Sequence, residues 1–129
     1  GHTNGDIVIY FPAQRVVHMG DLMAGVTPLI DYPGGGSVVE WIKTVDAAMT
    51  ALEFEKVIPG HGTVTNRAGL RTYRDNVEKL RTEVSTLVRQ GKTQEEVRAL
   101  LAKQYPAQYG NSGSLNNQWS LPGFMKELK

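Results

Sequence analysis

The sequence predicts an α/β fold in which a small β-sheet packs with helices and a helical extension follows. Short runs rich in β-branched and aromatic residues occur at 7–11, 15–19 and 56–58, as is typical of strands. Two longer segments, at about 38–52 and 67–90, repeat apolar residues at spacings of three and four, as one face of a helix does. The order strand, strand, helix, strand and then helices favours packed layers of sheet and helix.

The first two strand segments are separated by Pro12-Ala13-Gln14, which predicts a hairpin. Asp21 comes just after the second segment. From Leu22 to Gly36 the chain contains two prolines and three consecutive glycines, which predict a long loop.

Ser37 opens the first helix, and Glu40 three residues later predicts a capping box. The apolar residues of this helix form a single stripe that must pack on another element, and the sheet is the obvious partner. The stripe consists of Val38, Trp41, Ile42, Val45, Met49 and Leu52. The segment 56–58 then predicts a short buried strand that ends at Pro59.

A second helix is expected from about Arg67 to Gln90, because Gly91 fits the position after a helix end. Its apolar stripe also resembles a coiled-coil seam, but a stretch this short more often packs on its own domain. Four of its arginines, interspersed with acidic residues, predict a solvated face. They are Arg67, Arg71, Arg74 and Arg81.

Thr93 with Glu96 predicts a second capping box, at the start of a helix that stops before Pro106. Residues 106–118 are polar and predict a loop. The tail at 122–128 predicts one or two helical turns, whose packing residues would be Trp119, Phe124 and Leu128.

Composition limits the possible functions. At 129 residues the chain has about the length of one domain. Its net charge of +1 does not indicate binding to nucleic acid or to an anionic membrane surface. The absence of cysteine excludes disulfides and thiolate zinc sites but leaves the cellular compartment open. No apolar stretch approaches the roughly 18 residues of a membrane span.

Three short phrases each place a possible metal ligand beside glycine, near the end of an apolar run. They are Gly1-His2-Thr3-Asn4-Gly5-Asp6, His18-Met19-Gly20-Asp21 and Pro59-Gly60-His61-Gly62. Imidazole and carboxylate groups are good zinc ligands. His2 and Asp21 are 19 residues apart, and Asp21 and His61 are 40 apart, so these side chains can share a metal site only where strand ends converge.

Each of these residues also has a simpler interpretation. A Gly-His start is typical of a cloning remnant, although the continuation through Asp6 favours native sequence. Asp21 alone would more often be a loop or capping residue, and His61 between glycines fits a turn. Asn4 and Asp6 are better explained as turn formers than as ligands, and His18 as a packed or edge residue of a strand.

The three phrases resemble the second half of the metal-ligand set of the metallo-β-lactamase fold family. The resemblance implies that His2 is the third histidine on the first metal, Asp21 the aspartate that bridges two metals, and His61 the last histidine, on the second metal. It also implies zinc as the cofactor. Trp41 and its helix fall where the family places a helix between the last two ligands, and the later helices are similar to the C-terminal extension of some hydrolase-type members.

The resemblance implies half of the family's αββα sandwich at residues 1–66 and a packed helical extension at 67–129. The family's first ligand motif, His-x-His-x-Asp-His, is missing from this sequence. With His2, Asp21 and His61 shared between two metals, each metal would keep two protein ligands. The expectation is therefore a hydrolase fragment that is inactive alone, with no catalytic residue assigned, and it stays open whether the chain is an enzyme.

The parent reaction would be metal-hydroxide hydrolysis of a small molecule such as a lactam, ester or thioester. Selectivity would lie in residues 22–36 and the C-terminal helices. A lone half would expose an apolar sheet face, which predicts self-association or pairing with a complementing N-terminal half. The alternatives are a non-catalytic binding module that self-associates and a hydrolase whose missing ligands come from a separate chain.

Overall fold

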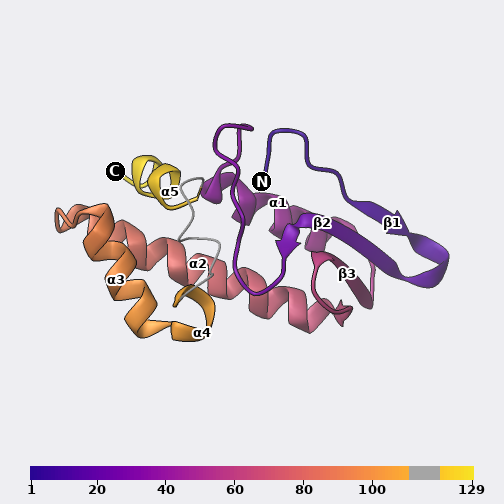
Figure 1. Cartoon of the computed structure of the whole chain (residues 1–129). Helices are drawn as coiled ribbons and strands as arrows, with labels where there is room; N and C mark the ends of the chain where they lie inside the picture. Colours follow the sequence, from indigo (N-terminus) through magenta and orange to yellow (C-terminus); the bar gives the residue numbers. More distant parts are fainter. Residues whose placement is uncertain (111–119) are drawn as a thin grey trace.

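The computed structural model describes residues 1–110 and 120–129, which form a four-stranded sheet and five α-helices (Figure 1). The strands are β1 (Ile9–Phe11), β2 (Val16–Ala24), β3 (Lys56–His61) and β4 (Thr65–Asn66). The helices are α1 (Val38–Ala51), α2 (Arg67–Arg89), α3 (Gln94–Gln104), α4 (Pro106–Tyr109) and α5 (Leu121–Glu127). The predicted α/β fold is confirmed.

The sheet has the order β1-β2-β3-β4, and its central pair, β2 and β3, is parallel. Parallel neighbours need a crossover connection, and α1 lies in it. β1 pairs with β2 as the predicted antiparallel hairpin, turned by the 3-10 helix Pro12–Gln14. The register places Val17 between Tyr10 and Val57 in one row, and His18 between Ile9 and Ile58 in the next.

Strand β2 is longer than the sequence predicted. It continues through Asp21 to Ala24, so the segment expected as a loop from Leu22 begins only at residue 25. The glycine and aspartate of the phrase resemble a strand end, but pairing with β3 carries β2 further, as far as the partner of His61, which is Ala24. A tertiary partner has overridden the local signal.

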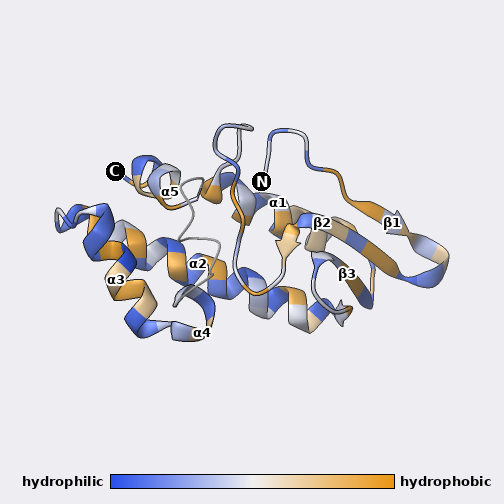
Figure 2. Ribbon diagram, viewed as in Figure 1, coloured by the Kyte–Doolittle hydropathy of each residue, from blue (hydrophilic) through white to orange (hydrophobic). Residues whose placement is uncertain are grey.

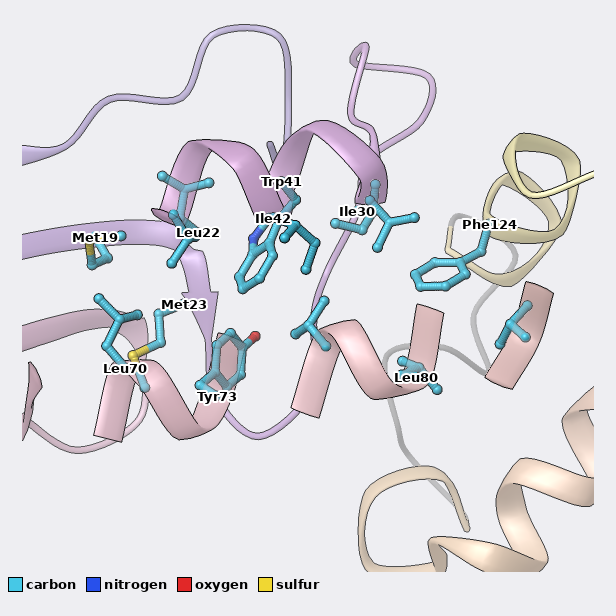
Figure 3. Packing of buried hydrophobic residues seen from close by; sticks show 14 of the residues in the cluster. Met19, Leu22, Met23, Ile30, Trp41, Ile42, Leu70, Tyr73, Leu80 and Phe124 are labelled. Atoms are coloured by element: carbon cyan, nitrogen blue, oxygen red, sulfur yellow. The ribbon is translucent and has the colours of Figure 1, made fainter. Parts of the chain in front are cut away.

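The buried core joins β2 and β3 to α1, α2 and the C-terminal helix α5 (Figure 3). Trp41 of α1 is fully buried, and its ring meets that of Tyr73 of α2 edge-on, with centroids 5.7 Å apart. Leu80 of α2 and Phe124 of α5 are buried in the same cluster. The apolar stripe of α2 therefore packs on its own chain, as expected. Of the packing residues predicted for the tail, Phe124 is buried and Leu128 packs partly buried against the core.

The two predicted capping boxes have different outcomes. At α3 both halves form, with Thr93 and Glu96 each accepting from the other's backbone N–H. At α1 the Ser37 hydroxyl accepts from Glu40 N at 3.0 Å, but the backbone N–H of Ser37 donates to the Gly1 carbonyl. The Glu40 carboxylate binds Lys43 instead. The second half of that box was therefore predicted wrongly.

The predicted solvated face of α2 is wrong for two of its arginines. Arg74 donates from Nε and Nη2 to the two carboxylate oxygens of Asp46 in α1, at 2.8 and 2.7 Å. Arg67 lies over the ring of Phe54 at 4.6 Å and donates to the Leu52 carbonyl. Both side chains therefore reach from α2 to other parts of the chain: Arg74 contacts α1, and Arg67 contacts the residues just after α1.

The C-terminal part agrees with the sequence in some respects. α5 provides the expected helical turns, whereas the short helix α4 replaces the start of the loop predicted at 106–118. Residues 111–118 of that loop and Trp119 lie outside the described residues. Within the described ranges, no helix is both long and apolar enough to cross a membrane. The division of the chain at residue 66 stays a prediction.

Candidate metal site

Asp21 leaves the core face of β2 because the strand changes phase just before it. Val17 and Met19 are buried, so strict alternation would also bury residue 21. Pairing with β3 is irregular on both sides of Gly20, which has a φ of +53°. After this irregularity Leu22 is buried in place of residue 21. The left-handed backbone at Gly20, which glycine adopts without strain, thus turns the Asp21 carboxylate away from the core.

The Asp21 carboxylate lies between two histidines from distant parts of the chain. Its Oδ2 is 3.6 Å from Nε2 of His2, and its Oδ1 is 3.2 Å from Nε2 of His61. His2 precedes β1, Asp21 lies in β2, and His61 is the last residue of β3. The structure therefore brings together the three side chains that the sequence singled out.

The two histidines differ in environment. His2 is buried, and its backbone carbonyl accepts from Asp31 N at 2.9 Å. Its Nδ1 is buried without a hydrogen-bond partner among the described residues, so the ring meets Asp21 through its other nitrogen. The His61 side chain is 68% exposed. One side of Asp21 is thus shielded and the other is open to solvent.

Gly60 makes room for this arrangement. A Cβ at residue 60 would lie 2.5 Å from Asp21 Oδ1 and 2.7 Å from the Gly20 carbonyl oxygen. No real Cβ approaches backbone so closely, so the close packing of β2 and β3 at this point requires glycine. The glycine of the Pro-Gly-His phrase is explained by this contact.

A depression of about 410 Å³ opens beside these residues, lined among others by His2, His18, Asp21 and Gly60. His18 lies in β2, an inner strand, and its Nδ1 accepts from Gly20 N at 3.1 Å. It is therefore not an edge residue. Asp6 also lines the depression, and its Oδ1 accepts from Thr3 N and Oγ, which is the turn role expected for it.

The donors fit part of a zinc site. Two imidazoles and a carboxylate are groups that zinc binds. Within residues 1–110 and 120–129, however, no three histidine, cysteine, aspartate or glutamate side chains are grouped so that they could hold one metal ion. His2 and His61 approach different oxygens of Asp21, so each histidine forms its own pair with the carboxylate. Assignment of these residues as ligands stays a prediction.

Sequence reasoning missed the packing that holds these side chains. The phase change at Gly20 and the contact between Gly60 and Asp21 depend on how two strands pair. The presence of a glycine beside each candidate ligand was the available signal. The hydrogen bonds around the His2 backbone, which come from residues 31–37, have no local signal in the sequence.

The fold is similar to that of known hydrolases. No protein-family model matches the chain, and no curated protein matches its sequence. Among solved structures, the DIM-1 metallo-β-lactamase is 24% identical, with a TM-score of 0.53, over 62% of this chain and 38% of its own. TMB-1 is 22% identical with the same TM-score and coverage. A double mutant of the sec-alkyl sulfatase PisA1 is 20% identical, with a TM-score of 0.64, over 99% of this chain and 22% of its own.

These similarities show the fold and confirm the expectation of a partial metallo-β-lactamase fold. The chain spans 38% of the two lactamase-like structures and 22% of the sulfatase. The match to the sulfatase extends over nearly the whole chain, so it includes the C-terminal helices.

Proposed function

We propose that this chain carries half of the active site of a zinc-dependent hydrolase, with His2, Asp21 and His61 as metal ligands. The observation that carries the proposal is the Asp21 carboxylate, whose two oxygens each face a different histidine. A carboxylate in that position suits a ligand shared between two metals. Zinc held by these residues would lower the pKa of a bound water, which would allow hydrolysis of a lactam, ester or thioester at neutral pH.

The residues around Asp21 would serve to orient and shield these groups. The buried His2 limits solvent on one side of the carboxylate, while the exposed His61 leaves the other side accessible. Gly60 has no Cβ to collide with Asp21 Oδ1, so the carboxylate can lie close against β3. A small-molecule substrate would enter through the open depression that is lined by His2, Asp21 and Gly60 among others.

With two protein ligands for each metal, the chain alone would bind zinc weakly and would not turn over substrate. A complete site then needs ligands from elsewhere, either a complementing N-terminal half or a separate chain. If neither is involved, the alternative is a binding module that keeps the fold without the chemistry.

Exposed apolar residues on one face of the sheet support the proposal that this chain associates with another copy or with a complementing half. Ile9 and Phe11 of β1 are 47% and 45% exposed, and Ile7 just before the strand is 72% exposed. Figure 2 shows this segment as hydrophobic. Ile9 is aligned with His18 and Ile58 on the same face, opposite to the row of Val17 and Val57 that is buried in the core. Self-association through this apolar face, or its coverage by a complementing half, would remove it from water.

The test is zinc binding by equilibrium dialysis, together with hydrolysis of a chromogenic β-lactam and an activated ester. The full chain is compared with Asp21→Asn and with Glu95→Gln, an exposed carboxylate of α3. We expect weak zinc binding that Asp21→Asn abolishes and Glu95→Gln preserves, without turnover by any of the three. Zinc binding equal in all three proteins would contradict the ligand assignment and favour the binding module. Two tightly bound zinc ions with turnover would contradict the half-site.

A further inference from the structure

The carboxylate of Glu127, in the C-terminal helix α5, lies against the first turn of α1. Glu127 Oε2 accepts from Val38 N at 3.0 Å and from the Tyr32 hydroxyl at 2.8 Å, and Oε1 accepts from the Ser37 hydroxyl. The first N–H groups of a helix have no partner within the helix, and a negative charge there is stabilising. Because the acceptor is ionised, these are among the stronger hydrogen bonds of the fold. Figure 1 shows α5 beside the start of α1.

The segment that Glu127 contacts also holds the backbone around His2. Ser37 N donates to the Gly1 carbonyl at 3.0 Å, and Asp31 N donates to the His2 carbonyl at 2.9 Å. Asn4 N donates to the Gly34 carbonyl at 2.9 Å. Residues 31–37 therefore bind the chain before, at and after His2, while Glu127 binds this segment at residues 32 and 37.

The segments that link Glu127 to His2 are closely packed and have little room to move. A Cβ at Gly36 would collide with the His2 carbonyl oxygen, and one at Gly123 of α5 would collide with the Tyr32 ring. The loop thus lies directly on the His2 backbone on one side, and Tyr32 lies directly on α5 on the other. A shift of the loop would be transmitted to His2.

We infer that Glu127 is a positioning residue for His2: through Tyr32 and Ser37 it fixes the loop that sets where the His2 imidazole stands relative to Asp21. The effect of Glu127 on zinc binding rests on the proposed function, whereas the anchoring of residues 31–37 by Glu127 does not. Among the described residues, Glu127, Tyr32 and Ser37 make no hydrogen bond to His61, so a Glu127 variant should displace His2 and leave His61 in place.

The test compares the full chain with Glu127→Ala, Tyr32→Phe and the control Glu95→Ala. Amide hydrogen exchange is measured at Asn4 and Asp31, and the ring nitrogen resonances of His2 and His61 are recorded by NMR without metal. Loss of hydrogen bonds to a charged group should speed exchange at the two amides about tenfold in Glu127→Ala. Tyr32→Phe, which removes one of the three bonds and retains the aromatic ring, should give about a threefold increase. The His2 resonances should move and those of His61 should not.

Zinc affinity is measured in parallel, and Glu127→Ala should lower it about tenfold, as loss of an outer positioning contact does. Unchanged exchange at Asn4 and Asp31 in both variants would overturn the inference. So would faster exchange spread equally over β2 and α2, which would make Glu127 a general stabiliser. If the amides and His2 respond as expected but zinc binds to none of the proteins, the positioning role stands and the proposed metal site is wrong.

Discussion

Gly60 lies directly against the carboxylate of Asp21, at a distance that leaves no room for a side chain at residue 60. Gly60→Ala must therefore displace either Asp21 or the backbone of β2 at Gly20. Overpacking of this kind typically costs about 1–3 kcal/mol of unfolding free energy. We also expect about tenfold weaker zinc binding, since the carboxylate loses its position between the histidines. Urea denaturation and zinc dialysis measure the two effects.

Gly5→Ala is the matched control for this substitution. Gly5 belongs to the same site-forming phrases, but a Cβ there meets nothing within 4 Å. Both measurements should stay at the parent value within error. An alanine at residue 60 that behaved like one at residue 5 would show that Asp21 does not need this space.

Asp46 and Arg74 should contribute a measurable coupling between α1 and α2. The guanidinium binds both carboxylate oxygens, and the side-chain hydrogen bond to Asp46 raises the pKa of Arg74. Asp46 is 46% exposed, so solvent screening limits the coupling to about 0.5–1 kcal/mol. A double-mutant cycle with Asp46→Asn and Arg74→Gln, followed by urea denaturation, gives this value. A coupling of zero at low salt would mean that the geometry is not maintained in solution.

Tyr32 should make the protein less stable at alkaline pH. Burial, followed by the hydrogen bond to Glu127 and its charge, raises the pKa of the phenol. The folded chain therefore keeps a proton that the unfolded chain loses near pH 10. The stability from this group is fully present below that pH and is lost as pH rises further. Raising the pH from about 9 to about 11 lowers the unfolding free energy of both proteins. The decrease should be about 1 kcal/mol smaller in Tyr32→Phe than in the parent.

Urea denaturation at a series of pH values checks this difference. Tyr73 and Tyr109 also have raised pKa values because of burial, so the variant should retain part of the alkaline loss. Parallel curves for the parent and Tyr32→Phe would contradict the burial of the Tyr32 phenol and its hydrogen bond to Glu127.

Phe11→Ser should weaken self-association of the chain. Phe11 is exposed on β1, and its loss removes apolar area from the proposed contact face. Light scattering over a range of concentrations should show a mass closer to that of one chain in the variant than in the parent. Leu100→Ser is the control, because Leu100 is similarly exposed on α3, away from the sheet. A parent that stays at the mass of one chain at high concentration would contradict the proposed self-association.

The elements of this fold were mostly predictable because their signals are local. The apolar spacing of α1 and α2 and the Thr93 capping box needed no tertiary information. β2 was predicted too short, because Gly20 and Asp21 look like a strand end until β3 pairs with them. The capping box at Ser37 failed for a similar reason, since the Gly1 carbonyl takes its backbone N–H.

For the candidate site, the three phrases led to the side chains that do converge, but their supports could not be predicted. Glu127 is 89 residues from the Val38 N–H that it accepts from, and nothing near either residue indicates the contact. Likewise, the reason for glycine at residue 60 is the neighbouring strand, which local sequence does not reveal. Positions that depend on packing between distant segments were therefore the ones missed.

The parallel pairing of β2 with β3 has a consequence for the order of folding. The hairpin partners Tyr10 and Val17 are seven residues apart, whereas Val17 and its partner Val57 are separated by 40. Contacts between distant residues close large loops and form slowly. The hairpin can thus form early, but His61 reaches Asp21 only after the crossover through α1 is complete. The candidate site is therefore expected to form later than the hairpin that carries Asp21.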